Sequence, residues 1–277
     1  MINTARRLAI AACLLLLALP AGAANGIYDV EIDGNVARVD IAVGSASATL
    51  TIRFESVVGL SADNLGLSAQ LIDPLSPGFV SRLGTGVSLP AAFPLVVKIS
   101  PPASGGLSFS GVASVELYTH DLQYTIGSPL RLYSAPNGGN FSDITTFVSS
   151  GSIRSGGSKA DFSEFIVVAD VRALSSVIQS KYSKLASLLN QHASSMSSGL
   201  QSELVSLYNA SASAFASGQV VAAITHLEAF DERVIAASGS GLPDVWRSSR
   251  DLTNVAGSLR SAAATLRYSL TLASNAS

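Results

Sequence analysis

The chain has 277 residues, of which 48% are hydrophobic, and its formal net charge is −2. This length accommodates one large domain or two ordinary ones, and the apolar content is enough for a sizeable core. Basic runs and aromatic residues interleaved with Lys or Arg are missing from the sequence, so it lacks the electrostatic footprint of a nucleic-acid-binding protein.

Residues 1–24 have the features of a secretory signal peptide. A pair of arginines precedes an apolar run from Leu8 to Leu19, which is shorter than the roughly 20 residues that a bilayer span needs. We expect cleavage near Ala23 and Ala24, a secreted or periplasmic protein, and no membrane insertion after the leader is removed. Cys13, the single cysteine, lies in this leader, so the mature chain is expected to have no disulfide and no thiolate metal site.

Residues 25–170 alternate short apolar runs with clusters of Gly, Pro, Asn and Ser. Many of the runs have a period of two, which is typical of antiparallel strands with one face in a core. Regularly spaced short strands predict a β-sandwich domain. The expected strands are IYDVEI, ARVDIAV, ATLTIRFES, LSAQLI, FPLVVKIS, GVASVELYT, LQYTI, PLRLYS, ITTFVSS and SEFIVVAD.

Residues 171–277 change to the helical period of 3.6. Short connections between the apolar stripes favour antiparallel packing, so we expect a four-helix bundle domain. The expected stripes run from Leu174 to Leu189, from Leu200 to Phe215 before Gly218, from Val221 to Val234 before Gly239, and from Val245 to Leu270 in a helix that Pro243 begins.

The predicted fold class is therefore a β-sandwich followed by an α-helical bundle, a two-domain all-β plus all-α chain with antiparallel sheets and about four helices. The junction FSEFIVVADVRALSSVI passes from strand to helix with no Gly, Ser or Pro tract that would make a flexible linker. We expect the bundle to dock against the sandwich and to move with it.

The stretch YDVEIDGNVARVD has the acidic spacing of a calcium-binding loop at Asp29, Glu31, Asp33 and Asp40. Such a loop needs a helix on each side, whereas the flanking sequence has the pattern of strands. We therefore expect a hairpin and no metal site, with these four carboxylates as the alternative calcium ligands.

The turn of this hairpin sets its register. A turn at Asp33 and Gly34, the stronger hairpin signal, places Asp29 opposite Arg38, an attractive cross-strand pair. A turn shifted by one residue would place Asp29 opposite Asp40, a repulsive pair unless a cation lies between them. We therefore predict the register in which Asp29 lies opposite Arg38.

Other candidate groups are scattered. His120 with Asp121, in a predicted hairpin turn, is the best acid–base pair, although a structural role is expected for both. His192 is expected on the solvent-facing end of a helix, and His226 beside an apolar stripe. RSGGSKADF is expected to be a hairpin loop, with an anion-binding nest as the alternative.

Trp246 is expected to seal the end of the bundle core, and a role as an interaction anchor is the alternative. Arg247 and Asp251 are expected to form an ion pair on the helix surface.

Several stretches together resemble a family of secreted proteobacterial proteins of unknown function. They are FPLVVKISPP, GVASVELYTHDLQY, PLRLYSAPNGGNFSDITTFVSSGSIRSGG, FSEFIVVADVR and LPDVWRSSRDLTNVAGSLRSAAATLRYSL. ASAFASGQVVAAITHLEAFDERVIAASG is in addition similar to helical-hairpin appendage domains of secreted bacterial proteins. The resemblance implies a Gram-negative envelope or extracellular location, and it implies no functional residue.

No nucleophile elbow, zinc-protease motif or phosphate-binding loop occurs in the mature chain. We expect a non-enzymatic recognition or structural protein, without a cofactor, that binds an envelope protein or a polysaccharide. The alternatives are a secreted hydrolase that uses His120 and nearby carboxylates, and a calcium-stabilised adhesion or matrix protein.

Overall fold

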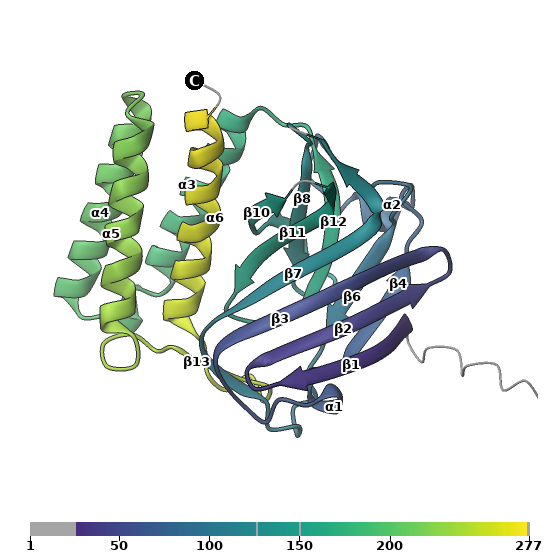
Figure 1. Cartoon of the computed structure of the whole chain (residues 1–277). Helices are drawn as coiled ribbons and strands as arrows, with labels where there is room; N and C mark the ends of the chain where they lie inside the picture. Colours follow the sequence, from purple (N-terminus) through teal and green to yellow (C-terminus); the bar gives the residue numbers. More distant parts are fainter. Residues whose placement is uncertain (1–25, 126, 150, 276–277) are drawn as a thin grey trace, which may run out of the picture.

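The computed structural model describes residues 26–125, 127–149 and 151–275, so the predicted signal peptide lies outside the described residues. In the described part, 13 strands form two antiparallel sheets and are accompanied by six α-helices (Figure 1). Two of these helices are short and lie among the strands, α1 (Ala62–Leu65) and α2 (Pro77–Val80). The other four lie after residue 170, so the expectation of about four helices applies only to the C-terminal part.

The first sheet has seven strands and contains most of the N-terminal part of the chain. The order across this sheet is β1-β2-β3-β7-β11-β10, and β13 pairs with β7. The strands are β1 (Ile27–Asp33), β2 (Val36–Val43), β3 (Ala46–Val58), β7 (Ser108–Tyr124), β10 (Thr145–Ser149), β11 (Gly151–Lys159) and β13 (Val245–Arg247).

The second sheet has six strands in the order β4-β6-β12-β8-β9, and β5 pairs with β12. The strands are β4 (Leu67–Leu71), β5 (Val87–Ser88), β6 (Leu95–Ile99), β8 (Leu130–Ala135), β9 (Ser142–Asp143) and β12 (Glu164–Asp170).

The two sheets face each other across a shared apolar core, in a sandwich-like arrangement. Side chains alternate along β3, where Leu50, Ile52 and Phe54 are buried while Ser47 and Arg53 are exposed. The same core cluster contains side chains of the second sheet, including Leu95, Val97, Phe165 and Val167. The period-two patterns of the sequence thus correctly predict which faces meet.

The second sheet is buried on both faces, which explains the uninterrupted apolar run FIVV in β12. Phe165 and Val167 face the first sheet, whereas Ile166 and Val168 belong to a second cluster on the other face. The segment between β4 and β6, which includes α2, contributes Phe79 and Leu89 to that cluster.

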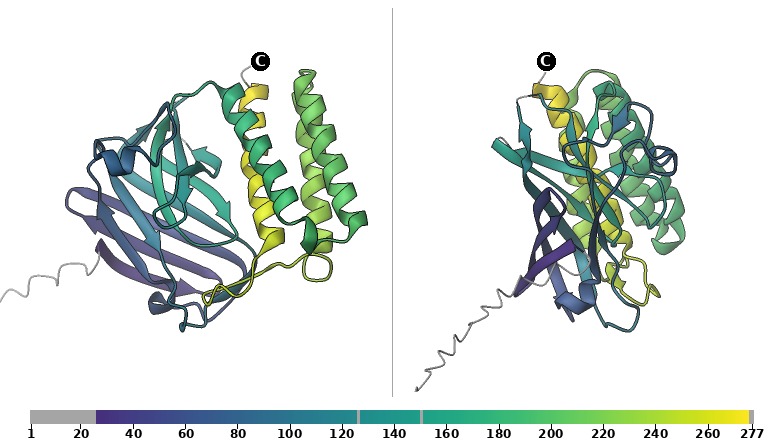
Figure 2. Two further views of the ribbon diagram at one scale, coloured as in Figure 1. Left: turned by 180° about the vertical axis from the view of Figure 1, so that it is seen from behind. Right: turned by 90° about the vertical axis from the view of Figure 1, so that its right-hand side faces the viewer.

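Most residues of the predicted apolar stripes are buried on the C-terminal helices, although Val221 is exposed, and α3 and α6 lie between the sheets and the pair α4–α5 (Figure 2). Gly218 and Gly239 have positive φ angles of 75° and 76° directly after α4 and α5, as expected for glycines that end helices. No helix in the described ranges is long and apolar enough to cross a membrane. The helices are α3 (Leu174–Gln191), α4 (Ser198–Ala216), α5 (Val220–Ala237) and α6 (Val255–Asn275), with a short 3₁₀ turn at Ala193–Ser195.

The predicted start of the last helix is wrong. The stretch Val245–Arg247, expected in its first turns, is strand β13 and pairs with Ser108–Ser110 of β7. Helix α6 begins ten residues later, where Asn254 Oδ1 accepts a hydrogen bond from the backbone N–H of Gly257 at 2.7 Å. Asn254 satisfies the helix N-terminus better than Pro243 could, because its side chain accepts from a free backbone donor.

The predicted hairpin forms, but in the other register. The turn is at Gly34 and Asn35, so Asp29 lies opposite Asp40, and Glu31 lies opposite Arg38. Gly34 has a φ of +53°, which glycine adopts at low cost, whereas a turn one residue earlier would place Asp33 in that region. Arg38 also contacts Asp40 at 3.8 Å, which offsets the repulsion between the two aspartates.

The sheets and the helices are joined by polar contacts as well as by apolar packing. Arg260 of α6 donates two hydrogen bonds to the carboxylate of Glu55 in β3, at 2.7 and 2.8 Å. Asn254 Nδ2 donates to the carbonyl of Gly111 at 2.6 Å. The helices therefore dock against the sheets, while the division into domains at residues 25–170 and 171–277 stays a prediction.

Candidate functional site

The four carboxylates named as alternative calcium ligands lie on a hairpin and do not form a loop around a cation. Asp29, Glu31 and Asp33 are exposed positions along the extended strand β1, and Asp40 is on the neighbouring strand β2. Alternate residues of a strand are about 6.6 Å apart, too far for successive ligands to wrap around one ion. Within the described part of the chain, no three His, Cys, Asp or Glu side chains gather as a metal site.

His120 lies inside the long strand β7, so the predicted turn at this stretch is wrong. Its Nε2 contacts the hydroxyl of Tyr118 at 2.9 Å and its Nδ1 contacts the hydroxyl of Ser152 at 2.8 Å. Asp121 points elsewhere and accepts a hydrogen bond from the backbone N–H of Ser47 at 2.7 Å. The structure thus does not bring His120 and Asp121 together as an acid–base pair.

Trp246 is buried, with 7% of its surface exposed, in the core between the sheets, so the prediction that it seals the bundle core is wrong. Its ring packs against Phe109 and Phe162, with centroid distances of 5.4 and 5.3 Å. This burial does not support a role as an interaction anchor.

The glycines of RSGGSKADF are part of strand β11 and form neither a loop nor an anion nest. A side chain on Gly156 would meet the ring of Phe147, and one on Gly157 would meet the backbone carbonyl of Ile144. The two glycines permit close packing of β11 against residues 144–147 of the same chain.

Three further predictions concern single polar side chains. His192 is buried, with 8% exposed, so the expectation of a solvent-facing position is wrong. His226 is half-buried on α5. Arg247 and Asp251 pair at 3.4 Å as predicted, although they lie in β13 and the loop that follows and not on a helix.

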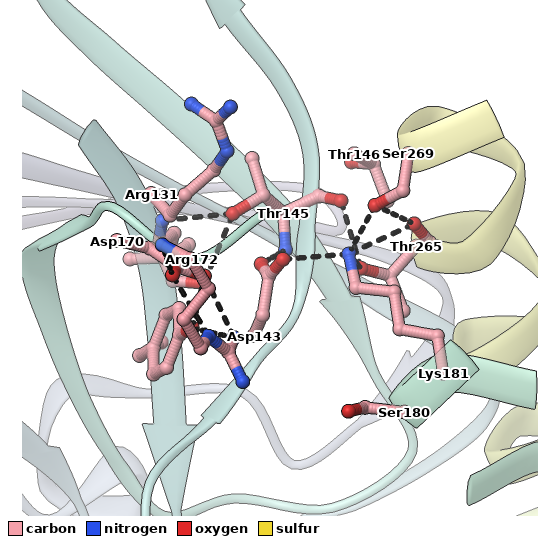
Figure 3. A network of polar contacts seen from close by, with 12 residues as sticks. Arg131, Asp143, Thr145, Thr146, Asp170, Arg172, Ser180, Lys181, Thr265 and Ser269 are labelled. Atoms are coloured by element: carbon pink, nitrogen blue, oxygen red, sulfur yellow. Dashed lines mark hydrogen bonds and ion pairs between the residues drawn. The ribbon is translucent and has the colours of Figure 1, made fainter. Parts of the chain in front are cut away.

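A buried ion pair at the junction of sheets and helices was missed by the sequence analysis. Lys181 of α3 contacts Asp143 of β9 at 2.6 Å, and their side chains are only 7% and 5% exposed (Figure 3). The ammonium also donates to the hydroxyls of Thr265 and Ser269 on α6, at 2.7 and 2.8 Å. Asp143 accepts a second hydrogen bond from the backbone N–H of Thr145 at 2.8 Å.

The partners of this pair fix its charge state. Burial lowers the pKa of Lys181, and the charge of Asp143 and its hydrogen bond to the ammonium oppose that shift. The hydroxyl of Thr265 donates to the carbonyl of Thr145 at 2.9 Å, so it can only accept from Lys181. All donors of the ammonium are directed at acceptors, which is how a buried charge is tolerated.

A second polar group lies nearby at the end of β12. Arg172 donates to both carboxylate oxygens of Asp170, at 2.8 and 2.7 Å, and to the hydroxyl of Tyr133 at 2.6 Å. Tyr133 donates to Asp170 at 2.7 Å. Burial raises the pKa of Tyr133, and the charge of Asp143 and the hydrogen bond to Asp170 add to the shift. The hydrogen bond to Asp170 raises the pKa of Arg172, so its guanidinium keeps its charge.

Several of these polar side chains line a crevice along the seam between sheets and helices. It consists of three hollows: the first of about 190 Å³, the second of about 180 Å³ and the third of about 320 Å³. The first and second share Asp143, Lys184 and Thr265 in their walls, and the second and third share Asp161 and Ser258. Neighbouring hollows therefore lie side by side along α6.

The walls of the crevice contain more basic than acidic side chains, although the whole chain has a formal net charge of −2. Its walls contain five basic side chains against two acidic ones. The basic residues are Lys159, Arg172, Lys181, Lys184 and Arg250, and the acidic residues are Asp143 and Asp161. Such a concentration of one sign in a recess favours an anionic ligand.

A model of a family of unknown function, DUF6689, matches residues 11–274. The chain belongs to DUF6689. Neither the curated proteins nor the solved structures gave a match. The resemblance to an uncharacterised family is thereby confirmed, while secretion and a proteobacterial origin stay predictions.

The sequence of this DUF6689 member did contain a signal for the buried pair. The apolar stripe of α3 has Val177, Ile178 and Leu185 on its face, and Lys181 occupies the position between them at helical spacing. A lysine within an apolar stripe predicts a buried or paired ammonium. Its partner Asp143 lies in the two-residue strand β9, and no sequence pattern links the two.

Proposed function

We propose that this protein is a non-enzymatic recognition protein, secreted or periplasmic, that binds an acidic polysaccharide in the crevice between its sheets and helices. The observation that carries the proposal is the excess of basic side chains in the crevice of a negatively charged chain. Long-range attraction would raise the local concentration of a polyanion and orient it along the seam.

Hydroxyl and amide groups along the crevice favour a hydroxylated ligand. Such groups both donate and accept, as saccharide hydroxyls do. Ser258 and Ser261 line the second hollow, and Asn137 lines the third.

Binding is favoured over catalysis because the most deeply buried ionisable groups of the crevice are already paired with other side chains of the protein. Lys181 is surrounded by Asp143 and two hydroxyls, and Arg172 and Tyr133 are held by Asp170. None of these groups is left as a free base or nucleophile. His120, the predicted acid–base group, lies elsewhere on β7 and does not line the crevice.

The test compares three polymers on the full chain by isothermal calorimetry. Polygalacturonate should bind, and its affinity should fall with added salt, because the attraction is screened. Dextran, which lacks charge, and polyglutamate, which lacks hydroxyls, should each bind at least roughly tenfold more weakly. Equal binding of dextran would refute the electrostatic part of the proposal, and equal binding of polyglutamate would favour an acidic protein partner.

Two charge variants locate the site. Lys184→Gln combined with Arg250→Asn should weaken polygalacturonate binding, because both positions line the crevice. Asparagine suits position 250, whose φ is +59°. Arg53→Gln, on the exposed face of β3, is the control and should keep the wild-type affinity. An equal loss in the control would place binding outside the crevice.

A further inference from the structure

The first hollow differs from the other two in having mainly apolar walls. Val87, Phe141, Val177 and Ala262 line it, together with the ring of Tyr133. Its volume is about 190 Å³. A cavity of about 150 Å³ in another protein accommodates benzene, so this hollow has room for a six-membered ring with one small substituent.

Most of the charge around the first hollow is already neutralised. Asp143 pairs with Lys181, and Asp170 pairs with Arg172. Lys184 also lines this hollow, and within the described part of the chain its ammonium makes no hydrogen bond and no ion pair. The hollow therefore presents one uncompensated positive charge beside an apolar wall.

Arg172 supplies a second hydrogen-bond donor for an anion in the first hollow. Arg172 uses Nε and Nη2 to hold Asp170 and Tyr133. Its Nη1 makes no hydrogen bond to any described residue, and the side chain lines the hollow. An ammonium and one guanidinium N–H suit a single carboxylate, whereas a phosphate dianion would exceed the one free charge.

We propose that the first hollow is a subsite for one carboxylate attached to an apolar body, with Lys184 as its counter-ion. The inference rests on the proposed function in placing a ligand in the crevice, and it goes beyond that proposal because a carboxylate on an apolar body is a different ligand from a polysaccharide. Phe141 and Val177 contact the apolar body, and Arg172 orients the carboxylate.

Benzoate is the probe, and benzamide is its uncharged isostere. In a calorimetric titration of the full chain, benzoate should bind with a dissociation constant on the order of millimolar, as expected for a ligand of this size. Benzamide and inorganic phosphate should each bind at least roughly tenfold more weakly, because one lacks the charge and the other the apolar body.

Three variants separate the subsite from general electrostatic effects. Lys184→Gln should lower benzoate affinity roughly tenfold to the level of benzamide, and its exposed position leaves the fold intact. Arg53→Gln, which also removes one exposed positive charge, is the matched control and should bind benzoate normally, because Arg53 lies on β3 and does not line the crevice. Ala262→Leu should abolish binding of both benzoate and benzamide by filling the hollow.

The outcomes are distinct from those of the polymer test. Benzoate that binds no better than benzamide or phosphate, or that is insensitive to Lys184→Gln, overturns the subsite even if polygalacturonate binds. Benzoate that binds with the expected dependence on Lys184 supports the subsite, and failure of polygalacturonate alongside it refutes only the polysaccharide proposal.

Discussion

Lys181 is the side chain on which the junction between sheets and helices depends most. Its ammonium connects three elements, because Asp143 lies on β9 while Thr265 and Ser269 lie on α6. A buried charge of this kind stabilises little by itself, since desolvation offsets the attraction, but removal of one partner leaves the other charge buried and unpaired.

We predict that Lys181→Met lowers the free energy of unfolding by about 3–5 kcal/mol, because Asp143 then remains as an unpaired buried carboxylate. Methionine fills most of the space of the lysine stem, so the loss reports mainly on the charge. Urea denaturation at pH 7 measures the effect.

Lys184→Met, three residues along the same helix and exposed, is the control for that measurement. It should change the free energy of unfolding by no more than about 0.5 kcal/mol. Adding Asp143→Asn to Lys181→Met should recover part of the loss, because it removes the stranded charge. A loss below about 1 kcal/mol in Lys181→Met would contradict the burial of the pair.

The carboxylate of Asp170 is expected to contribute to the free energy of unfolding in a way that is lost at acidic pH. Burial raises the pKa of this carboxyl, but the hydrogen bonds from Arg172 and Tyr133 outweigh it, and the pKa is lowered below its usual value. The folded state therefore binds the proton more weakly than the unfolded chain does. The stabilisation is complete above the unfolded pKa of about 3.9 and is lost as pH falls through the lower folded pKa.

Asp170→Asn should accordingly destabilise the protein at pH 7, and its effect should shrink as pH falls from 7 to below about 3.9, because the wild type then loses the same stabilisation. Urea denaturation across this pH range measures the convergence of the two proteins. Asp33→Asn, in the exposed tip of the first hairpin, is the comparison. A difference between wild type and Asp170→Asn that stays constant with pH would show that the ionised form is not the one stabilised.

Single residues also show where prediction from sequence stops. The hairpin of β1 and β2 was predicted correctly, whereas its register was decided by the backbone angle that Gly34 adopts. Charge pairing favoured the other register, but exposed pairs contribute less than the cost of a non-glycine residue in the left-handed region. Lys181 was detectable as a lysine in an apolar stripe, but Asp143 was not.

At the scale of elements, strands with a clear period of two and helices with long apolar stripes were predicted well. The missed strands are short or glycine-rich: β5, β9, β11 and β13. Strand β13 follows two residues after a proline, and only its pairing with Ser108–Ser110 makes it a strand. Strand β11 contains Gly156 and Gly157, whose close contacts with Phe147 and Ile144 become visible only in three dimensions.

The crossing of α6 over β7 leads to a prediction about glycine. A side chain on Gly257 would lie 2.6 Å from the carbonyl oxygen of Gly111 and 2.7 Å from the side chain of the helix cap Asn254. Gly257→Ala should therefore lower the free energy of unfolding by about 1–3 kcal/mol, as overpacking does. The gain in helix propensity, up to about 1 kcal/mol, would be outweighed.

Gly199 in the first turn of α4 is the matched control. It is exposed, and an added side chain would meet no atom within 4 Å. Gly199→Ala should stabilise the protein by up to about 1 kcal/mol through helix propensity alone. Thermal unfolding of both variants gives the comparison, and a stabilising Gly257→Ala would show that α6 and β7 do not approach closely in solution.

At the scale of the whole molecule, docking of the helices was predicted from the missing linker, whereas the crevice was not. The spacing of apolar residues changes from a period of two to a period of 3.6 near Asp170. This change predicts the strands and the helices separately and does not predict the contacts between them. The polar groups of the seam come from β9, from the end of β12, from α3 and from α6, which are far apart in the sequence. Periodicity reports which face of an element is buried, but not which polar groups two buried faces bring together.

The connectivity predicts that sheets and helices unfold together. Strand β13 lies between α5 and α6 in the chain and pairs with β7, so the helices cannot separate without removing a strand from the first sheet. The same step would break two ion pairs, Arg260–Glu55 and Lys181–Asp143.

Calorimetry should therefore give one unfolding transition in which the calorimetric and van't Hoff enthalpies agree. Far-UV circular dichroism should report the same midpoint as the fluorescence of Trp246, which lies in the core between the sheets. Two resolved transitions would show instead that the boundary at residue 170 separates independently stable units, and the crevice could then open by motion of one unit against the other.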